Sequence, residues 1–141
     1  MRSTAFAALA IAAFLLATAA VRPAAAGPEA ILTVTNLSST RVHIAFHQLL
    51  PLPKYFAAWA AGHGRTVFTM PETVHGIVYA SVKLPDDTRE DPMEVCLASL
   101  PITVEVGKTV NLNASAWNFR SVDDPRIGTL HKADCKVAYA T

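Results

Sequence analysis

Apolar and polar side chains alternate along several short segments after Gly27. The clearest run lies between residues 31 and 46, where the apolar positions in phase are Leu32, Val34, Val42, Ile44 and Phe46. A period of two residues is typical of strands that bury one face. Such runs recur about every ten residues, with turn-forming residues between them and without a long helical period, which predicts an all-β fold. We expect a small antiparallel β-sandwich of about seven or eight short strands with immunoglobulin-like topology.

Two pairs of neighbouring segments have alternation patterns that match across a connection. Opposed residues of an antiparallel pair share a face, so a turn at 36–40 would place Val34 opposite Val42. Segments 65–70 and 77–84 alternate in the same way and would be joined by the residues between them. The pattern predicts a hairpin at each of these places.

A third hairpin is expected around Gly107. A two-residue turn there would put Glu105 on a buried face, which the cost of burying a charge disfavours. A three-residue loop, 107–109, places Val106 opposite Val110 instead, and Gly107 or a neighbour can adopt the left-handed conformation that such a loop requires. The following strand is expected at 110–114.

Other segments have simpler patterns. Short strands are expected at 95–100 and 135–139, where apolar and polar residues again alternate. Residues 85–92 contain four acidic residues and two prolines, which predicts a solvated loop.

The segment 49–61 is ambiguous. It contains Leu-Leu-Pro-Leu-Pro followed by several aromatic residues. A short helix could begin at Pro53 and end at Gly62, or a strand could lead into a turn at 61–64. Both alternatives stay open from the sequence.

The first 26 residues have the features of a secretory signal. Arg2 precedes an apolar run over residues 5–21, and small residues at Ala24 and Ala26 suit cleavage after Ala26. A permanent transmembrane anchor is the alternative, although the run lies at the short limit for a span. We expect residues 1–26 to be removed and residues 27–141 to form one domain without stable membrane insertion, located in a periplasm or secreted.

The two cysteines, Cys96 and Cys135, are expected to form a disulfide. An even number of cysteines in an oxidising compartment is typical of disulfide pairing, and neither thiol has a second ligand at metal-binding spacing. On the chain-entropy account, closing a loop of roughly 40 residues stabilises the fold by about 4 kcal/mol.

The charge balance argues against nucleic acid as a partner. The whole chain has a formal net charge of +1, and loss of the leader removes Arg2 and Arg22, so 10 basic residues then face 11 acidic ones. A nearly neutral domain without a basic stripe lacks the electrostatic footprint of a phosphate-binding protein. The same composition disfavours anionic membranes.

Aromatic residues are the main binding candidates. They fall in two groups that are expected on loops at an end of the sandwich: Tyr55, Phe56 and Trp59, and Trp117 and Phe119. Exposed aromatic side chains can stack on sugars or contact a protein. The alternative is that they close the end of a small core.

A metal site is the second class of function considered. His63, Met70 and His75 lie near expected turns, and imidazole and thioether groups suit copper or zinc. His43 and His47 share a strand face but would be about 13 Å apart, too far to bind one ion together. These residues support only an alternative function, a periplasmic copper- or zinc-handling protein.

Catalysis is the third class. No Gly-x-Ser-x-Gly motif is present, and the acidic pairs Asp86-Asp87 and Asp123-Asp124 are better explained as solvated loop charge. A small hydrolase would need a serine or an acid beside a histidine. No cofactor is expected.

Asn36 and Asn113 match the N-glycosylation sequon, which matters only in a eukaryotic source. Together these features lead us to expect an exported, non-catalytic interaction module. It would recognise an extracytoplasmic protein or glycan through end loops or a sheet edge, and inhibition of an extracellular enzyme is one form of that function.

Overall fold

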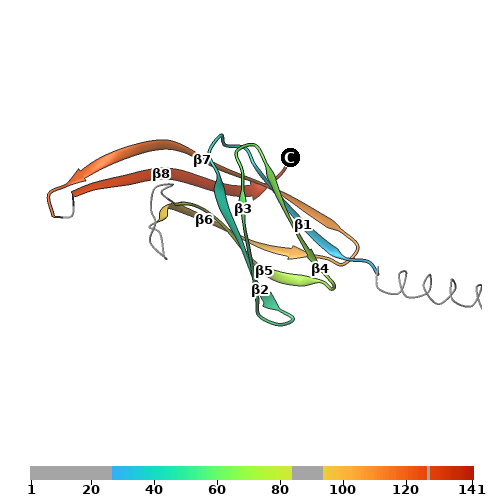
Figure 1. Cartoon of the computed structure of the whole chain (residues 1–141). Helices are drawn as coiled ribbons and strands as arrows, with labels where there is room; N and C mark the ends of the chain where they lie inside the picture. Colours follow the sequence, from blue (N-terminus) through green and yellow to red (C-terminus); the bar gives the residue numbers. More distant parts are fainter. Residues whose placement is uncertain (1–26, 84–93, 127) are drawn as a thin grey trace, which may run out of the picture.

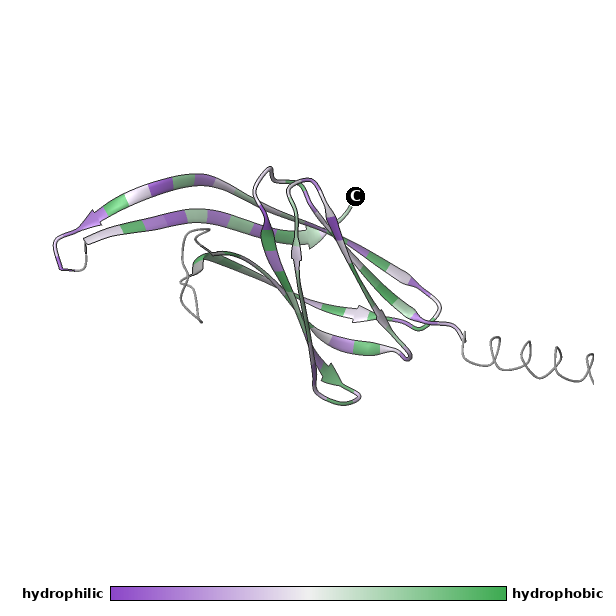
Figure 2. Cartoon of the chain, viewed as in Figure 1, coloured by the Kyte–Doolittle hydropathy of each residue, from purple (hydrophilic) through white to green (hydrophobic). Residues whose placement is uncertain are grey.

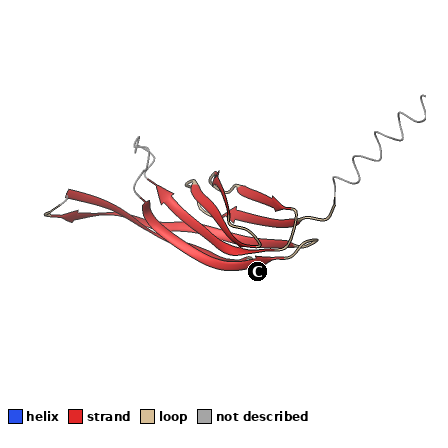
Figure 3. Ribbon diagram, turned by 90° about the horizontal axis from the view of Figure 1, so that it is seen from below, coloured by secondary structure: helices blue, strands red, loops and turns tan. Residues whose placement is uncertain are grey.

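The computed structural model describes residues 27–83, 94–126 and 128–141, and the expected leader and the acidic loop at 85–92 lie outside them. The described residues form strands and no helix (Figures 1 and 3). The strands are β1 (Ala30–Asn36), β2 (Val42–Leu50), β3 (Lys54–Ala60), β4 (Arg65–Met70), β5 (Val74–Lys83), β6 (Glu94–Val104), β7 (Thr109–Asp124) and β8 (Gly128–Tyr139).

The strands form two four-stranded sheets, with the orders β4-β1-β7-β8 and β3-β2-β5-β6. All strand pairs are antiparallel except β1 with β7, which is parallel. The expected all-β sandwich with one disulfide is therefore confirmed. The immunoglobulin-like topology is not confirmed.

Alternation of burial holds along the strands. In β4, Thr66, Phe68 and Met70 are buried while the residues between them are exposed. The largest fully buried side chains come from both sheets and include Leu32 and Leu112 on one side and Ile44 and Phe46 on the other. The core thus lies between the sheets, as the period of two requires.

The three expected hairpins are wrong in their pairing. Strand β1 pairs with β4 and β7, while β2 pairs with β3 and β5, so Val34 and Val42 belong to different sheets. The same holds for β4 and β5 and for β6 and β7, so Val106 and Val110 do not face each other across a hairpin. The observed hairpins are β2–β3, β5–β6 and β7–β8. Two apolar residues on neighbouring segments can both be buried in two ways: as partners within one sheet, or on opposite sheets across the core. The alternation pattern is the same in both cases.

Asn36 ties the β1–β2 crossing to the β3–β4 turn. Its side-chain amide donates hydrogen bonds to the carbonyl oxygens of Thr40, Ala60 and Ala61, and its amide oxygen accepts one from the Ser38 N–H. Asn36 is fully buried. A glycan would replace one of the two amide hydrogens and would need space beside a fully buried side chain, so this sequon is not accessible in the folded domain.

The ambiguous segment contains strand β3, which pairs with β2 over its whole length. The side chains of β3 alternate between its two faces, so the aromatic residues expected to act together lie on opposite faces. Tyr55 and Trp59 are exposed, whereas Phe56 is half-buried and packs between the rings of Phe46 and Phe68, with centroid distances of 6.1 Å to each. Phe56 is therefore a packing residue, as the alternative reading of the aromatic residues anticipated.

Strands β7 and β8 continue together beyond the rest of the sandwich (Figure 1). The sequence pattern predicts that this strand ends at Ala114, but β7 extends to Asp124, so Trp117 and Phe119 lie on a strand and not on a loop. Hydrophobic residues are interspersed among hydrophilic ones along the projecting part (Figure 2). We name residues 117–126 and 128–132 the β7–β8 arm.

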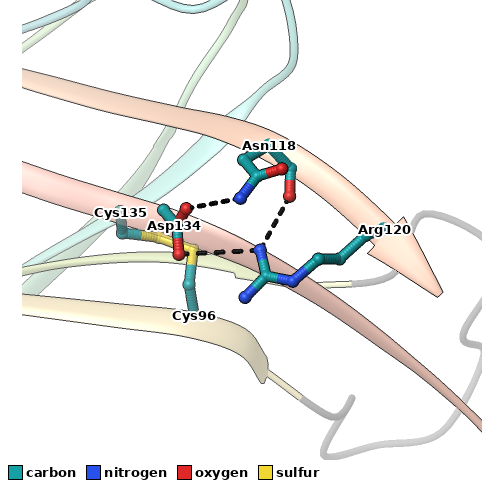
Figure 4. Close-up of polar contacts among 5 residues, drawn as sticks. All are labelled: Cys96, Asn118, Arg120, Asp134 and Cys135. Carbon is teal, nitrogen blue, oxygen red and sulfur yellow. Dashed lines mark hydrogen bonds and ion pairs between the residues drawn. A yellow bond between two sulfur atoms is a disulfide. The ribbon is translucent and has the colours of Figure 1, made fainter. Parts of the chain in front are cut away.

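A polar cluster and the disulfide mark the base of this arm (Figure 4). The register shifts between Trp117 and Arg120, and Asn118 adopts a positive φ of 55°. The Asn118 amide donates to Asp134, and Arg120 contacts both the Asn118 carbonyl oxygen and the Asp134 carboxylate. Next to it, the expected disulfide joins Cys96 of β6 to Cys135 of β8, with 5.6 Å between the Cα atoms.

Gly76 is required by the close approach of β2 to β5. A Cβ atom at this position would meet the His47 carbonyl oxygen, and it would lie 2.7 Å from the Phe46 ring and 2.9 Å from the Gln48 Cα. We therefore expect Gly76→Ala to lower the free energy of unfolding by about 2 to 3 kcal/mol, because overpacked strands must move apart. Urea denaturation measures this change.

Gly27→Ala is the matched control for Gly76→Ala, since a Cβ there has no neighbour within 4 Å. It should leave the urea midpoint unchanged. Equal midpoints for both variants would contradict the close packing at Gly76.

Candidate functional site

The outer face of sheet β3-β2-β5-β6 gathers aromatic and imidazole rings. Alternation directs His43 and His47 of β2 to this face, and the strand register places Trp59 opposite His43 and Tyr55 opposite His47. Strand β5 adds Tyr79, which lies opposite Ala45. We name these five ring-bearing residues the histidine–aromatic face: His43, His47, Tyr55, Trp59 and Tyr79.

The rings of this face contact one another edge to face. His47 lies between two tyrosines, with centroid distances of 4.7 Å to Tyr55 and 4.8 Å to Tyr79. His43 contacts Trp59 at 4.9 Å, and the Arg41 guanidinium lies 4.1 Å from the centre of the Trp59 ring. Cross-strand ring pairs of this kind stabilise one arrangement of the side chains. The face is therefore largely preformed.

Small side chains between the rings leave a hollow of about 240 Å³. Ala45 and Ser81 are buried beneath the rings and form its floor. Its lining residues are His43, Ala45, His47, Tyr55, Tyr79, Ser81 and Leu97. Small-molecule sites usually enclose about 300–1,000 Å³. The hollow therefore fits one ring-sized group of a ligand.

Two further hollows lie along the same sheet. One of about 360 Å³ shares His47 and Tyr55 with the first hollow and extends to Leu49 and Pro53. Another of about 520 Å³ begins at Leu49 and reaches His75 and Thr103 across β5 and β6. The first and second hollows share His47 and Tyr55, and the second and third share Leu49, so the three hollows follow one another along the sheet.

The structure separates the aromatic residues that the sequence analysis grouped as binding candidates. Tyr55 and Trp59 belong to the histidine–aromatic face, whereas Phe56 points into the core. Trp117 and Phe119 are exposed on β7, in the other sheet. The histidine–aromatic face therefore includes only two of these five residues.

Sequence reasoning missed Arg41, Tyr79 and Ser81, which complete this face. Alternation in 77–84 placed Tyr79 and Ser81 in one phase, opposite to the core residues. That signal identifies their side of the strand. It does not reveal that β5 lies beside β2.

The three candidate metal ligands are not brought together. His63 lies in the turn before β4, Met70 ends β4, and His75 follows the next turn. Strand β4 alone spans roughly 20 Å, and Met70 is buried in the core. Within residues 27–83, 94–126 and 128–141, no group of three or more His, Cys, Asp or Glu residues could hold a metal ion.

Three histidines lie beside hydroxyl groups, which is the arrangement that a hydrolase would require. His75 and Thr103 are 2.8 Å apart, and Ser121 and His131 are 3.3 Å apart. Both of these pairs are exposed, so solvent surrounds the hydroxyl groups. His43 lies opposite Ser81, whose buried position keeps its hydroxyl from reaching a bulky substrate. Acyl transfer also needs oxyanion donors in a site that excludes water, whereas both exposed pairs are open to water.

Among the described residues, no helix is both long and apolar enough to span a bilayer. Comparisons of the chain with protein-family models, with curated proteins and with solved structures give no match. The histidine–aromatic face is consequently the feature on which a functional proposal can be based.

Proposed function

We propose that this chain is an exported, non-catalytic binding module that holds a glycan on the histidine–aromatic face. The observation that carries the proposal is the hollow between His47, Tyr55 and Tyr79, with its floor of small residues. Export is supported by the Cys96–Cys135 disulfide, since disulfides persist mainly outside the cytoplasm.

The chemistry of the hollow suits an uncharged sugar ring. A pyranose has an apolar face of C–H groups and a rim of hydroxyl groups, and aromatic rings can stack on the first. Tyrosine and histidine side chains can form hydrogen bonds with the hydroxyl groups of the rim. The described residues that line the hollow include no carboxylate, lysine or arginine. A neutral ligand is therefore favoured over an anion or a cation.

The two further hollows favour an oligosaccharide over a single sugar. They run from the central hollow past Leu49 toward His75, so a chain of several rings could follow the sheet. A protein partner is the other occupant considered, and the Arg41–Trp59 pair is of the residue types that dominate protein interfaces.

A glycan array probed with the exported protein tests this proposal, followed by titration of the best oligosaccharide. We expect Tyr55→Ala to weaken binding at least about tenfold, because the mutation removes a wall of the hollow. Tyr55 is 62% exposed, so its loss should leave the fold intact.

Trp117→Ala is the matched control, because Trp117 is also an exposed aromatic residue but lies on the other sheet. Its affinity should equal that of the unmodified protein. An array without bound glycans, or equal losses in both variants, would contradict the proposal. Co-purification of a protein whose binding is lost in Tyr55→Ala would assign the face to a protein partner instead.

A further inference from the structure

The edge of β7 is open along the β7–β8 arm. Strand β1 covers β7 only over Thr109 to Ala114, and the Ser38 hydroxyl then bonds to both the N–H and the carbonyl oxygen of Ala116. From Trp117 to Asp124, β7 pairs with β8 alone among the described strands. An unpaired strand edge offers N–H and C=O groups to another strand.

The arm also leaves apolar side chains uncovered. Trp117, Phe119 and Val122 are all exposed on this stretch of β7. A two-stranded ribbon without a further layer is only marginally stable in water. The arm therefore combines an open edge with apolar surface, and it lies away from the histidine–aromatic face on the other sheet.

We propose that the open edge of β7 pairs antiparallel with the same edge of a second copy of this chain. Opposed residues of an antiparallel pair have side chains on the same face of the sheet. In a symmetric pair of identical strands, the two-fold axis must therefore lie between one residue and the same residue of the other copy. With Val122 opposite Val122, Arg120 of each chain faces Asp124 of the other. Ser121 then lies opposite Asp123. Over residues 120–124, this register matches apolar, charged and polar groups.

The neighbouring registers lack this complementarity. A two-fold axis at Asp123 would oppose two like charges directly. An axis at Ser121 would place Arg120 opposite Val122 and Phe119 opposite Asp123. Of these three arrangements, only the one centred on Val122 places Arg120 opposite an acidic residue.

The charged partners can exchange their present contacts. Arg120 lies 3.6 Å from Asp134, and Asp124 lies 3.6 Å from the highly exposed Arg126. Ion pairs at such solvent-accessible positions are weak. A second copy can therefore add contacts to both side chains without breaking a buried network.

Sedimentation equilibrium of the exported protein over a range of concentrations tests this inference. We expect a monomer–dimer equilibrium, and Val122→Lys should raise the dimer dissociation constant at least about tenfold, because two lysines would meet on the axis. Val67→Lys is the matched control, since Val67 is an exposed valine on β4, the edge strand of the same sheet. It should leave the equilibrium unchanged.

Exchange of the charges at Arg120 and Asp124 shows whether a variant loses the dimer through the strand pairing or through unfolding. Arg120→Glu and Asp124→Arg should each weaken the dimer about tenfold, and the double variant should restore it, because the charges then match again. A protein that remains monomeric at about 100 µM, or a dimer that Val122→Lys does not weaken, would overturn the inference. Failure of the double variant to recover would exclude the register centred on Val122.

Discussion

Replacement of Asn36 by alanine is expected to lower the free energy of unfolding by about 4 kcal/mol. The two N–H groups of the Asn36 amide are shared among three carbonyl oxygens, with N···O distances of 2.8 Å to Thr40, 3.2 Å to Ala60 and 3.1 Å to Ala61. Its amide oxygen accepts the Ser38 N–H at 2.9 Å. Each neutral hydrogen bond contributes about 1 kcal/mol, and a buried group left without a partner costs about 1 to 3 kcal/mol.

Asn36→Asp distinguishes hydrogen bonding from shape. Aspartate fills the same volume but cannot donate to the three carbonyl oxygens, and its charge would be buried beside them. We expect its loss of stability in urea denaturation at neutral pH to equal or exceed that of Asn36→Ala.

Asn113→Ala serves as the control for Asn36, because Asn113 lies on β7 and is only half-buried. We expect it to cost less than about 1 kcal/mol. The assigned role of Asn36 would be wrong if Asn36→Asp were as stable as the unmodified protein.

Loss of the disulfide should have an effect of similar size. Cys96 and Cys135 are 39 residues apart in the sequence, and on the entropy account this loop restricts the unfolded chain by about 4 kcal/mol. The bond also joins β6 to β8, which are edge strands of different sheets. Its removal should therefore loosen β8 before the rest of the sandwich.

The double variant Cys96→Ala/Cys135→Ala tests this in urea denaturation, with hydrogen exchange to locate the loosened strand. We expect a lower midpoint and faster exchange in β8. A reductant should lower the midpoint of the unmodified protein and leave that of the double variant unchanged. Equal midpoints for the two proteins without reductant would rule out a stabilising role for the bond.

The sequence predicts the strands of this fold far better than their partners. Alternation depends on which side chains are buried, and both sheets bury theirs in the same core. Val34 and Val42 are each fully buried, yet they lie in different sheets. Neighbouring strands that cross between sheets therefore have the same pattern as a hairpin. The pairing depends on long-range contacts that a local pattern does not contain.

The length of β7 shows a different limit. Burial on β7 stops at Ala116, while the strand continues to Asp124 with exposed residues on both faces. A strand that pairs only with β8 has no buried face and thus no reason to alternate. For this reason Trp117 and Phe119 were expected on a loop.

The candidate site could be predicted in part. Alternation correctly placed His43 and His47 on one strand face. Their companion Tyr55 was recognised as a binding candidate, but the choice between helix and strand at 49–61 hid the fact that Phe56 points the opposite way. Tyr79 joins them only through the pairing of β5 with β2, which the local sequence does not encode.

Mapping of amide chemical shifts by NMR during titration with an array-selected oligosaccharide tests the central claim most directly. The account predicts that the largest shifts fall on β2 and β5 around Ala45 and Tyr79, beneath the histidine–aromatic face. Shifts confined to the turns at the ends of the sandwich, or to residues 117–124 of the β7–β8 arm, would contradict it.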